Sequence, residues 1–459
     1  MAMVGISENV HMKFILLLIC GTVTIGFIFM HESIVGAKPA NQAIMDWVYV
    51  ESVNLGGMTK DEAEEVLYKY VDQVVMQPII LTLGDEAWQL HPADLNIHVF
   101  VPETVEKALA VGRTGSWLER LRFRGAPQEK AINIPLAVSV DGGLFRDFIF
   151  NLMTEIYIHP EDAAFIINQD DTVTIKPSIT GRRLDLQDFG SRIRRLLTRG
   201  SDRTLVLTVE PIIPRFTTRQ AEDMGIKECI SKFATSFDSG NKPRVHNIKE
   251  AASAIDRTIL GPGETFSFNK VVGPRSAETG YLEAPIMIDD DLVPGIGGGI
   301  CQVSSTLYNA ALLANLTIIA RGNHSMVPAY IAAGRDATVA YDYIDLKFRN
   351  DGENYILIKF FVTESTVTSK IYGCIPDAPN RKVSVVTVIN EKIPPGIIEK
   401  EDPLLAPGDK IVEDEGAWGY IVTVYRVVEH EGIEQSRERI SRDRYRPRPK
   451  RIRVGTGLS

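Results

Sequence analysis

Apolar positions recur at helical spacing along the first half of the chain, between short runs that alternate as strands do. The clearest helix follows Thr59, which can cap it, and carries an apolar face of Ala63, Val66, Leu67 and Tyr70. The same patterns predict further helices over 102–111, 142–156 and 184–197, and strands over 48–53, 79–83, 132–140 and 173–175. Because strands and helices alternate in a recurring order, we expect residues 45–215 to form two related α+β units.

The rest of the chain divides at a linker that contains Pro376 and Pro379. Residues 217–373 mix strand and helix patterns, whereas residues 380–456 are rich in β-branched residues, with glycines at turns. Strands are predicted over 383–389 and 419–428, so this last region is expected to be a small all-β domain. The fold class expected for the whole chain is therefore α+β and multidomain.

The stretch from Phe14 to Met30 is uncharged and about 17 residues long, near the lower limit for a bilayer span. Lys13 precedes it, and no strong basic cluster follows, which predicts that the bulk of the chain lies outside the membrane. A small-residue pattern ending at Ala37 also fits a cleaved signal. Residues 1–37 are thus expected to be an export segment, and we favour a single-pass transmembrane helix over cleavage.

Composition is that of folded domains, with 44% hydrophobic and 24% charged residues among 459, more than one core usually organises. A net charge of −9 argues against a nucleic-acid partner, which would require a basic surface. Outside the apolar segment stand Cys229, Cys301 and Cys374, an odd number. A disulfide between Cys229 and Cys374, or two buried thiols, would both leave Cys301 unpaired.

The sequence around Cys301 carries the candidate chemistry. Gly297, Gly298 and Gly299 precede an apolar-periodic helix, so the backbone is expected to turn tightly there and to place Cys301 in the first helical turn. Unpaired N–H groups and the helix dipole lower the pKa of a thiol at that position and favour the thiolate. The loop lacks the preceding strand and downstream acid of a dinucleotide site, and no metal-ligand spacing stands out, so no cofactor or metal is expected.

A cysteine nucleophile usually needs a base, and His324 lies 23 residues further on. The helix, a turn and a strand over 316–320 would return the chain toward Cys301, where an imidazole could accept and donate a proton. The alternative is that Cys301 is a small buried hydrophobe and His324 an ordinary loop residue. Their combination with the glycine loop and the helix start favours catalysis.

Residues 217–373 resemble the VanW family, named from accessory proteins of glycopeptide-resistance clusters. The resemblance rests on Arg244, Asn247 and Ile248 and on segments 262–269, 272–275, 280–281, 297–306, 324–325, 334–339 and 345–350. One departure is the sequence Arg-Gly-Asn over 321–323, where members often carry Glu-Arg before the histidine segment. Any role for that acid is therefore doubtful in this chain.

The flanking regions resemble the usual companions of that family. Leu-Gly-Gly-Met-Thr at 55–59 and Thr-Gly-Arg-Arg-Leu-Asp at 180–185 resemble the YoaR-like peptidoglycan-binding domain, and 380–456 resembles a G-five (G5) domain. The second resemblance implies adhesion to wall glycans, although a purely structural β appendage fits equally. The arginine-rich tail over 437–453 would form a solvated strand face or lie against anionic wall polymers or lipid headgroups.

Some VanW-domain proteins are L,D-transpeptidases, so the resemblance implies acyl transfer between peptidoglycan stem peptides at the outer face of the cell membrane. Cys301 would attack the peptide carbonyl, His324 would move the proton, and the amides of Gln302 and the glycine loop would hold the oxyanion. Arg335 could bind a substrate carboxylate. Asp336 could orient His324 or pair with Arg335.

Two further residues complete the candidate substrate site. Ser304 is taken mainly as a helix-start residue, and Ser325 follows the histidine directly. Two rival functions stay open: a non-catalytic wall-binding protein, and a cysteine hydrolase of peptidoglycan that transfers the acyl group to water.

Overall fold

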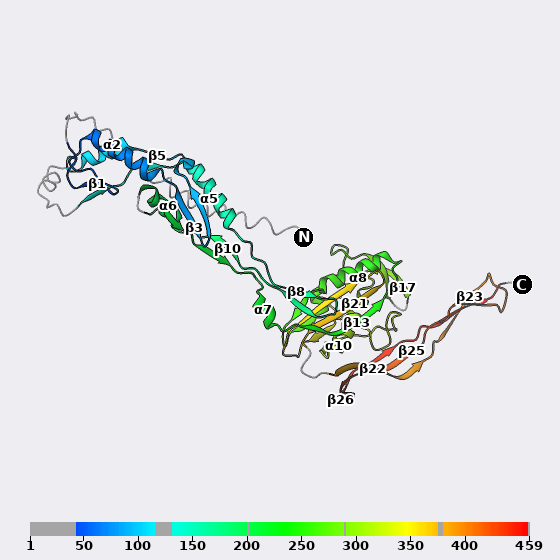
Figure 1. Ribbon diagram of the computed structural model, residues 1–459. Helices are drawn as coiled ribbons and strands as arrows, with labels where there is room; N and C mark the ends of the chain where they lie inside the picture. Colours follow the sequence, from blue (N-terminus) through cyan, green and yellow to red (C-terminus); the bar gives the residue numbers. More distant parts are fainter. Residues whose placement is uncertain (1–42, 115–130, 200–201, 289–290, 375–379, 458–459) are drawn as a thin grey trace. The chain divides into compact units, whose positions relative to one another are not determined.

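The computed structural model describes residues 43–114, 131–199, 202–288, 291–374 and 380–457 (Figure 1). The expected export segment over 1–37 lies outside these residues. Within the described ranges, no helix combines the length and the apolar character needed to cross a membrane. Contacts divide the chain into two compact units, one of residues 1–161 and 179–214 and one of residues 162–178 and 215–459.

The first unit contains two hydrophobic cores. One core gathers β1, α2, α3 and β6, and the other gathers β3, α5, α6 and β11. The elements of this unit are β1 (Val48–Val50), β2 (Val53–Asn54), α2 (Lys60–Tyr70), η2 (Val71–Val75), β3 (Ile79–Leu83), β4 (Glu86–Leu90), η3 (Pro92–Leu95), β5 (His98–Val99), α3 (Val101–Ala110), β6 (Ile132–Ile134), β7 (Val138–Ser139), α5 (Gly142–Ile156), β10 (Gly181–Leu184), α6 (Phe189–Thr198), β11 (Thr204–Val206) and β12 (Val209–Ile212).

The local signals for helices in this unit act as expected. Thr59 caps α2 through a reciprocal capping box with Glu62, and α5 spans the predicted 142–156. The two cores are interleaved along the chain, because β1 pairs in parallel with β6 and β3 pairs in parallel with β11. Two α+β halves are thus present, but they are not consecutive in the sequence.

The prediction of a helix over 184–197 is wrong in its first turn. Residues 181–184 form strand β10, which pairs antiparallel with β12, and the helix α6 begins only at Phe189. A strand partner that lies more than 20 residues further along cannot be read from helical spacing, so pairing overrides the local pattern there.

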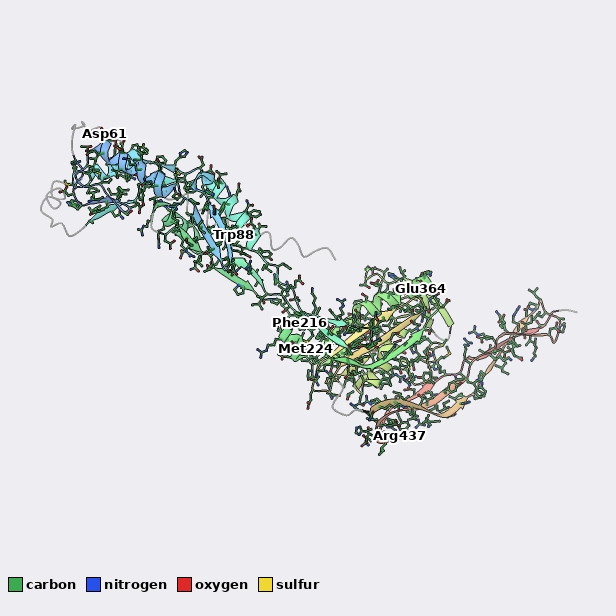
Figure 2. The ribbon with its side chains drawn as sticks, viewed as in Figure 1. Asp61, Trp88, Phe216, Met224, Glu364 and Arg437 are labelled. Carbon is green, nitrogen blue, oxygen red and sulfur yellow. The ribbon has the colours of Figure 1, made fainter. Side chains whose placement is uncertain are left out.

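The strand expected over 173–175 in the first region is β9 (Val173–Lys176), which pairs with β8 (Ala164–Ile167) in a hairpin that belongs to the second unit. Its apolar side joins a small core with Leu357 and Tyr372, and Phe165 contacts Phe216, labelled in Figure 2, with ring centroids 6.0 Å apart. At its turn, Asp171 accepts hydrogen bonds from the side chains of Lys370 and Tyr372.

The central region of the second unit, residues 215–374, is a four-stranded antiparallel sheet in the order β13-β21-β20-β14 with α8 and α10 packed on it (Figure 1). A second sheet, β15-β19-β18, and the hairpin β16–β17 complete it. Its elements are α7 (Thr218–Asp223), β13 (Glu228–Ser236), α8 (Lys242–Ile255), β14 (Thr258–Leu260), β15 (Thr265–Ser267), α9 (Phe268–Val272), β16 (Glu283–Ile288), β17 (Asp291–Ile296), α10 (Ile300–Leu313), β18 (Thr317–Ala320), β19 (Lys347–Arg349), β20 (Ile356–Val362) and β21 (Thr366–Gly373).

The C-terminal region, residues 380–457, is all-β, as expected. It forms two three-stranded sheets, β22-β25-β26 and β23-β27-β24, and the arginine-rich tail supplies β26 and β27. Val385 and Ile440 pack against the core of the central region, so the two regions share an apolar contact. The strands are β22 (Arg381–Ile393), β23 (Ile397–Asp402), β24 (Lys410–Asp414), β25 (Gly419–His430), β26 (Ile433–Tyr445) and β27 (Lys450–Gly455).

No disulfide joins the three described cysteines, so the alternative of a Cys229–Cys374 bond gives way to that of separate thiols. Cys229 is half-buried, and its sulfur lies 3.1 Å from the carbonyl oxygen of Ser231. Burial raises the pKa of the Cys229 thiol. That cysteine is therefore expected to be unreactive.

Candidate functional site

The glycine loop places Cys301 in the first turn of α10. Gly297 and Gly299 have φ angles of 87° and 108°, a region that favours glycine, and Gly299 is the N-cap of the helix. A Cβ on Gly298 would lie 2.7 Å from the carbonyl oxygen of Pro285, so only glycine allows the loop to approach β16 so closely. The sequence prediction of a tight backbone before Cys301 is confirmed by these angles and this approach.

The backbone at this turn includes amides that have no backbone hydrogen bond. Ile300 and Gln302 donate their N–H groups to the carbonyl oxygens of Gly297 and Gly299. Among the described residues, the N–H of the intervening Cys301 has no such hydrogen bond. Of the amides expected to bind an oxyanion, that of Gln302 is thus engaged, whereas those of Gly298 and Gly299, like that of Cys301, have no backbone partner among the described residues.

His324 and Asp336 meet beside Cys301. Nδ1 of His324 lies 2.6 Å from Oδ2 of Asp336, and the same carboxylate oxygen accepts the backbone N–H of His324 at 2.7 Å. Asp336 therefore fixes both the ring and the backbone of the histidine. The imidazole also interacts electrostatically with the Cys301 side chain, whose sulfur lies 3.6 Å from the carbonyl oxygen of Val339. The three side chains form a chain of contacts from thiol to imidazole to carboxylate.

The electrostatics of this group favour an ion pair between sulfur and imidazole. Burial opposes charge on Cys301, but the hydrogen bond and positive charge of His324 outweigh it and lower the pKa of the thiol. Burial likewise opposes charge on His324, yet Asp336 and Cys301 raise its pKa to about 9. The pKa of Asp336 is lowered, because His324 and Arg321 outweigh the effect of its burial. These shifts favour a thiolate, an imidazolium and a carboxylate over the neutral forms of the three groups.

Residues of the C-terminal region stabilise the position of Asp336. Tyr445 donates its hydroxyl to Oδ1 of Asp336 at 2.5 Å and accepts the backbone N–H of Gly334 at 2.7 Å. Arg321, whose side chain is 5% exposed, bridges Oδ1 of Asp336 at 3.0 Å and Oδ1 of Asp443 at 2.7 Å. Tyr445 of β26 therefore holds the carboxylate that orients His324 directly, and Asp443 of β26 acts on it through Arg321.

The remaining predicted residues have mostly structural partners. Gln302 is buried and bonds Arg244 at 2.6 Å and Thr235 at 2.9 Å. Ser304 is buried and donates to the carbonyl oxygen of Ala337 at 2.6 Å, which holds the Asp336 segment against α10. Ser325 is exposed, and its carbonyl oxygen accepts the N–H of Arg446.

Arg335 has a different place from the one expected. Its Nε donates to the side chain of Asn309, its guanidinium lies 5.4 Å from the ring centroid of Phe233, and Nη1 lies 3.4 Å from the carbonyl oxygen of Val385. Asp336 pairs with Arg321 instead of Arg335. The guanidinium of Arg335 thus connects α10 with β22.

Sequence reasoning missed Arg321, Asp443 and Tyr445. Arg321 stood where the family resemblance expected an acid, and that departure was the available signal. The other two residues lie in a different region more than 100 positions from Asp336, and no spacing rule connects them.

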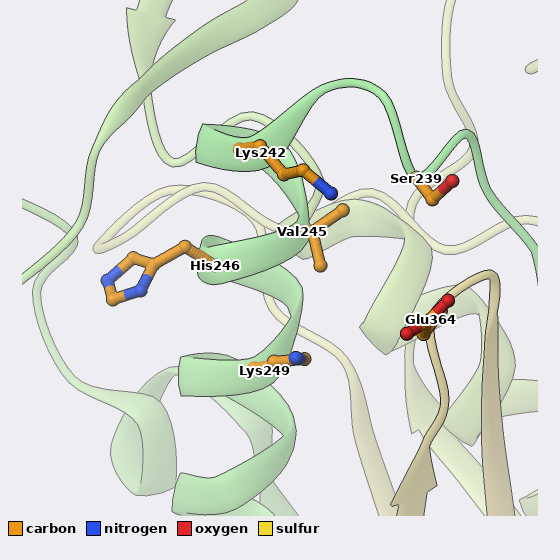
Figure 3. Close-up of a pocket in the computed structure, with 6 residues that line it drawn as sticks. All are labelled: Ser239, Lys242, Val245, His246, Lys249 and Glu364. Atoms are coloured by element: carbon orange, nitrogen blue, oxygen red, sulfur yellow. The ribbon is translucent and has the colours of Figure 1, made fainter.

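A surface pocket of about 330 Å³ lies elsewhere in the central region (Figure 3). Lys242, Val245, His246 and Lys249 come from successive turns of α8, and Ser239 and Glu364 come from neighbouring loops. None of the candidate site residues lines this pocket. The pocket is therefore separate from the candidate site around Cys301.

Three family models match separate parts of the chain. Residues 243–372 match "VanW like protein", residues 88–206 match "Putative peptidoglycan binding domain", and residues 384–457 match "G5 domain". The last two matches indicate association with cell-wall polymers, in agreement with the expected wall-binding domains.

Similar proteins extend the match over more of the chain. "Uncharacterized protein YoaR" of Bacillus subtilis (strain 168) is 34% identical over 257 residues, which are 54% of this chain and 83% of that protein. "Vancomycin B-type resistance protein VanW" of Enterococcus faecalis (strain ATCC 700802 / V583) is 36% identical over 145 residues, 30% of this chain and 53% of that protein. The solved IgA1 protease G5 domain is 29% identical and covers 17% of this chain and 92% of its own, with a TM-score of 0.14. The chain therefore belongs to the VanW/YoaR family and ends in a G5 domain.

Proposed function

We propose that this chain is a cysteine acyltransferase of the L,D-transpeptidase type that acts on peptidoglycan stem peptides outside the cell membrane. The observation that carries the proposal is the contact chain of Cys301, His324 and Asp336 at the start of α10. A thiolate beside an imidazolium is the resting state that a cysteine nucleophile requires.

In the first half of the reaction, the Cys301 thiolate attacks the stem-peptide carbonyl at an L-centre. The N–H of Cys301 donates a hydrogen bond to the oxyanion that forms. The His324 imidazolium then gives its proton to the nitrogen of the terminal D-residue, which leaves as an amine. The product is a thioester between the shortened stem and Cys301.

In the second half, an amine of another stem attacks the thioester carbonyl. Neutral His324 accepts a proton from that amine, an amide bond forms, and the thiolate leaves beside the restored imidazolium. Asp336 keeps the imidazole in one orientation through both halves, because it accepts from Nδ1 and leaves the other ring nitrogen to face the sulfur. No group other than the two stems is consumed.

The domain matches on both sides support a wall substrate. A peptidoglycan-binding domain and a G5 domain would hold the chain on the polymer and raise the local concentration of stems at Cys301. The export segment expected over 1–37 would place the chain on the same side of the membrane as that polymer.

The test incubates the full-length protein with disaccharide tetrapeptides and follows crosslinked dimers by mass spectrometry. Wild type and Cys229→Ser are expected to form dimers, because the Cys229 thiol has a raised pKa and lies outside the site. Cys301→Ser is expected to form none. Equal dimer formation by Cys301→Ser would remove the enzyme proposal and favour the non-catalytic wall-binding alternative.

A second arm separates transfer from hydrolysis. Without an acceptor amine, a transpeptidase accumulates the thioester on Cys301, which intact-protein mass spectrometry detects. Rapid release of free tripeptide with no dimer in the presence of acceptor would instead identify a hydrolase.

A further inference from the structure

Arg275 has a buried guanidinium to which no described residue provides a hydrogen-bond acceptor. Its Nε, Nη1 and Nη2 are all sealed from solvent, and none has a hydrogen-bond partner. Buried polar groups in folded proteins are almost always paired, and a charged donor without an acceptor is costly. Three buried donors without an acceptor therefore indicate a binding site for a ligand that supplies acceptors.

The neighbours of Arg275 stabilise its charge without accepting its protons. The guanidinium carbon lies 5.4 Å from the ring centroid of Phe268 and 5.8 Å from that of Tyr341, distances typical of cation–π contacts. Asp345 is a nearby carboxylate, but its oxygens accept from Ser267 and from the backbone N–H of Asn269. The N–H groups of the Arg275 guanidinium therefore remain without acceptors among the described residues.

Arg275 also lies beside the cysteine. A Cβ on Gly297, at the start of the glycine loop, would be 3.5 Å from Cβ of Arg275, so the arginine stem packs against the loop that delivers Cys301. The charge of Arg275 contributes to the lowered pKa of the Cys301 thiol. Arg244 also faces Cys301, but its Nη2 is bonded to Gln302.

We propose that Arg275 binds the free C-terminal carboxylate of the acyl-donor peptide and so restricts the site to the last peptide bond of a chain. This inference rests on the proposed function for the identity of that peptide. The terminal carboxylate lies one residue, about 4 Å along the chain, from the attacked carbonyl, a separation that suits an arginine beside the nucleophile. A guanidinium fork matches a carboxylate with two parallel hydrogen bonds.

Tyr341 is the more exposed of the two rings beside the guanidinium. It is 39% exposed and occupies a tight turn in which Ala340 and Ile344 exchange backbone hydrogen bonds. The incoming carboxylate displaces the Tyr341 ring and takes over the pairing of the guanidinium. Arg335, whose donors are held by Asn309 and Val385, has no such capacity.

The first test needs no transpeptidase activity. Iodoacetate and iodoacetamide both alkylate a thiolate with loss of iodide, but only iodoacetate carries a carboxylate. The measured quantity is the rate constant of iodoacetate divided by that of iodoacetamide at Cys301. This ratio does not depend on the thiolate fraction, because both reagents attack the same thiolate. The ratio is expected to fall about tenfold in Arg275→Gln, which corresponds to the loss of one charge-assisted contact.

The matched control is Arg275→Lys, which keeps the charge and loses the planar fork. Its ratio is expected to lie well below that of wild type. If the ratio in Arg275→Lys equals that of wild type, the preference for iodoacetate comes from charge alone and the planar fork is not used. If the ratios are equal in all three proteins, no carboxylate binds at Arg275. The circular dichroism spectrum reports whether each variant is folded.

The second test compares a stem peptide that ends in a carboxylate with the same peptide ending in an amide. Wild type is expected to prefer the acid by about 10- to 100-fold in kcat/KM, and Arg275→Gln is expected to treat both alike. A wild type that turns over both peptides equally overturns the carboxylate site and leaves the proposed function. Turnover of neither, with the iodoacetate preference intact, overturns the function and leaves the carboxylate site.

Discussion

The hydroxyl of Tyr445 donates a hydrogen bond to Oδ1 of Asp336. Tyr445 lies in β26 of the G5 domain, and Asp336 is the carboxylate that holds His324. The same tyrosine accepts the N–H of Gly334, so one side chain fixes both the carboxylate and the backbone beside it. The G5 domain is thus part of the scaffold of the candidate site, in addition to any role in binding wall polymers.

Tyr445→Phe should destabilise the second unit by about 1–3 kcal/mol, because it leaves the buried Asp336 oxygen and the Gly334 N–H each short of one partner. Urea denaturation measures the loss. Tyr425→Phe, on the neighbouring strand β25, is the control, and its cation–π contact with Arg437 survives because the ring is kept. Equal stability of Tyr445→Phe and wild type would mean that the hydroxyl contributes nothing to this scaffold.

Alkylation of Cys301 by iodoacetamide should reach half its maximal rate at a lower pH than that of an ordinary thiol. The pKa of the thiol is lowered, and the raised pKa of His324, about 9, keeps the imidazolium beside it until the pH passes that value. In His324→Gln the half-maximal pH should rise by about one unit or more, toward the ordinary thiol value. Coincident pH profiles for the two proteins would contradict the ion pair.

Asp336→Asn should lower the pKa of His324 below its value of about 9. An amide carries no negative charge, so burial, which favours the neutral imidazole, then meets less opposition. NMR titration of the imidazole signal that is missing in His324→Gln measures the shift. Asp345→Asn is the control, since that carboxylate bonds Ser267 and Asn269, and its titration curve for His324 should overlay that of wild type.

Gly298→Ala should destabilise the second unit by about 1–3 kcal/mol through overpacking, because the new methyl would meet the immobile carbonyl oxygens of Ala284 and Pro285. The matched change is Gly142→Ala at the start of α5, where a Cβ meets nothing within 4 Å. Thermal unfolding compares the two. A neutral Gly298→Ala would show that the loop does not need its close approach to β16.

The fold could be anticipated where the signals are local. The cap at Thr59 and the span of α5 follow from residues within one or two turns, so the sequence pattern is sufficient there. The helix expected over 184–197 begins only at Phe189, because Leu184 ends strand β10, whose partner β12 lies outside any local window. The hairpin β8–β9 joined the second unit for a similar reason, since Phe216 and Tyr372 cover its apolar face.

What the sequence by itself determined is the local chemistry: three glycines permit the turn, and the turn places Cys301 at the start of a helix. The tertiary structure alone decided which charged groups surround that thiol. The sequence offered Arg335 as a partner of Asp336, but Arg321 takes that place, because a guanidinium on a long flexible side chain pairs wherever packing places an acceptor. The contact between Tyr445 and Asp336 spans 109 positions, and only the packing of β26 onto the central region brings them together.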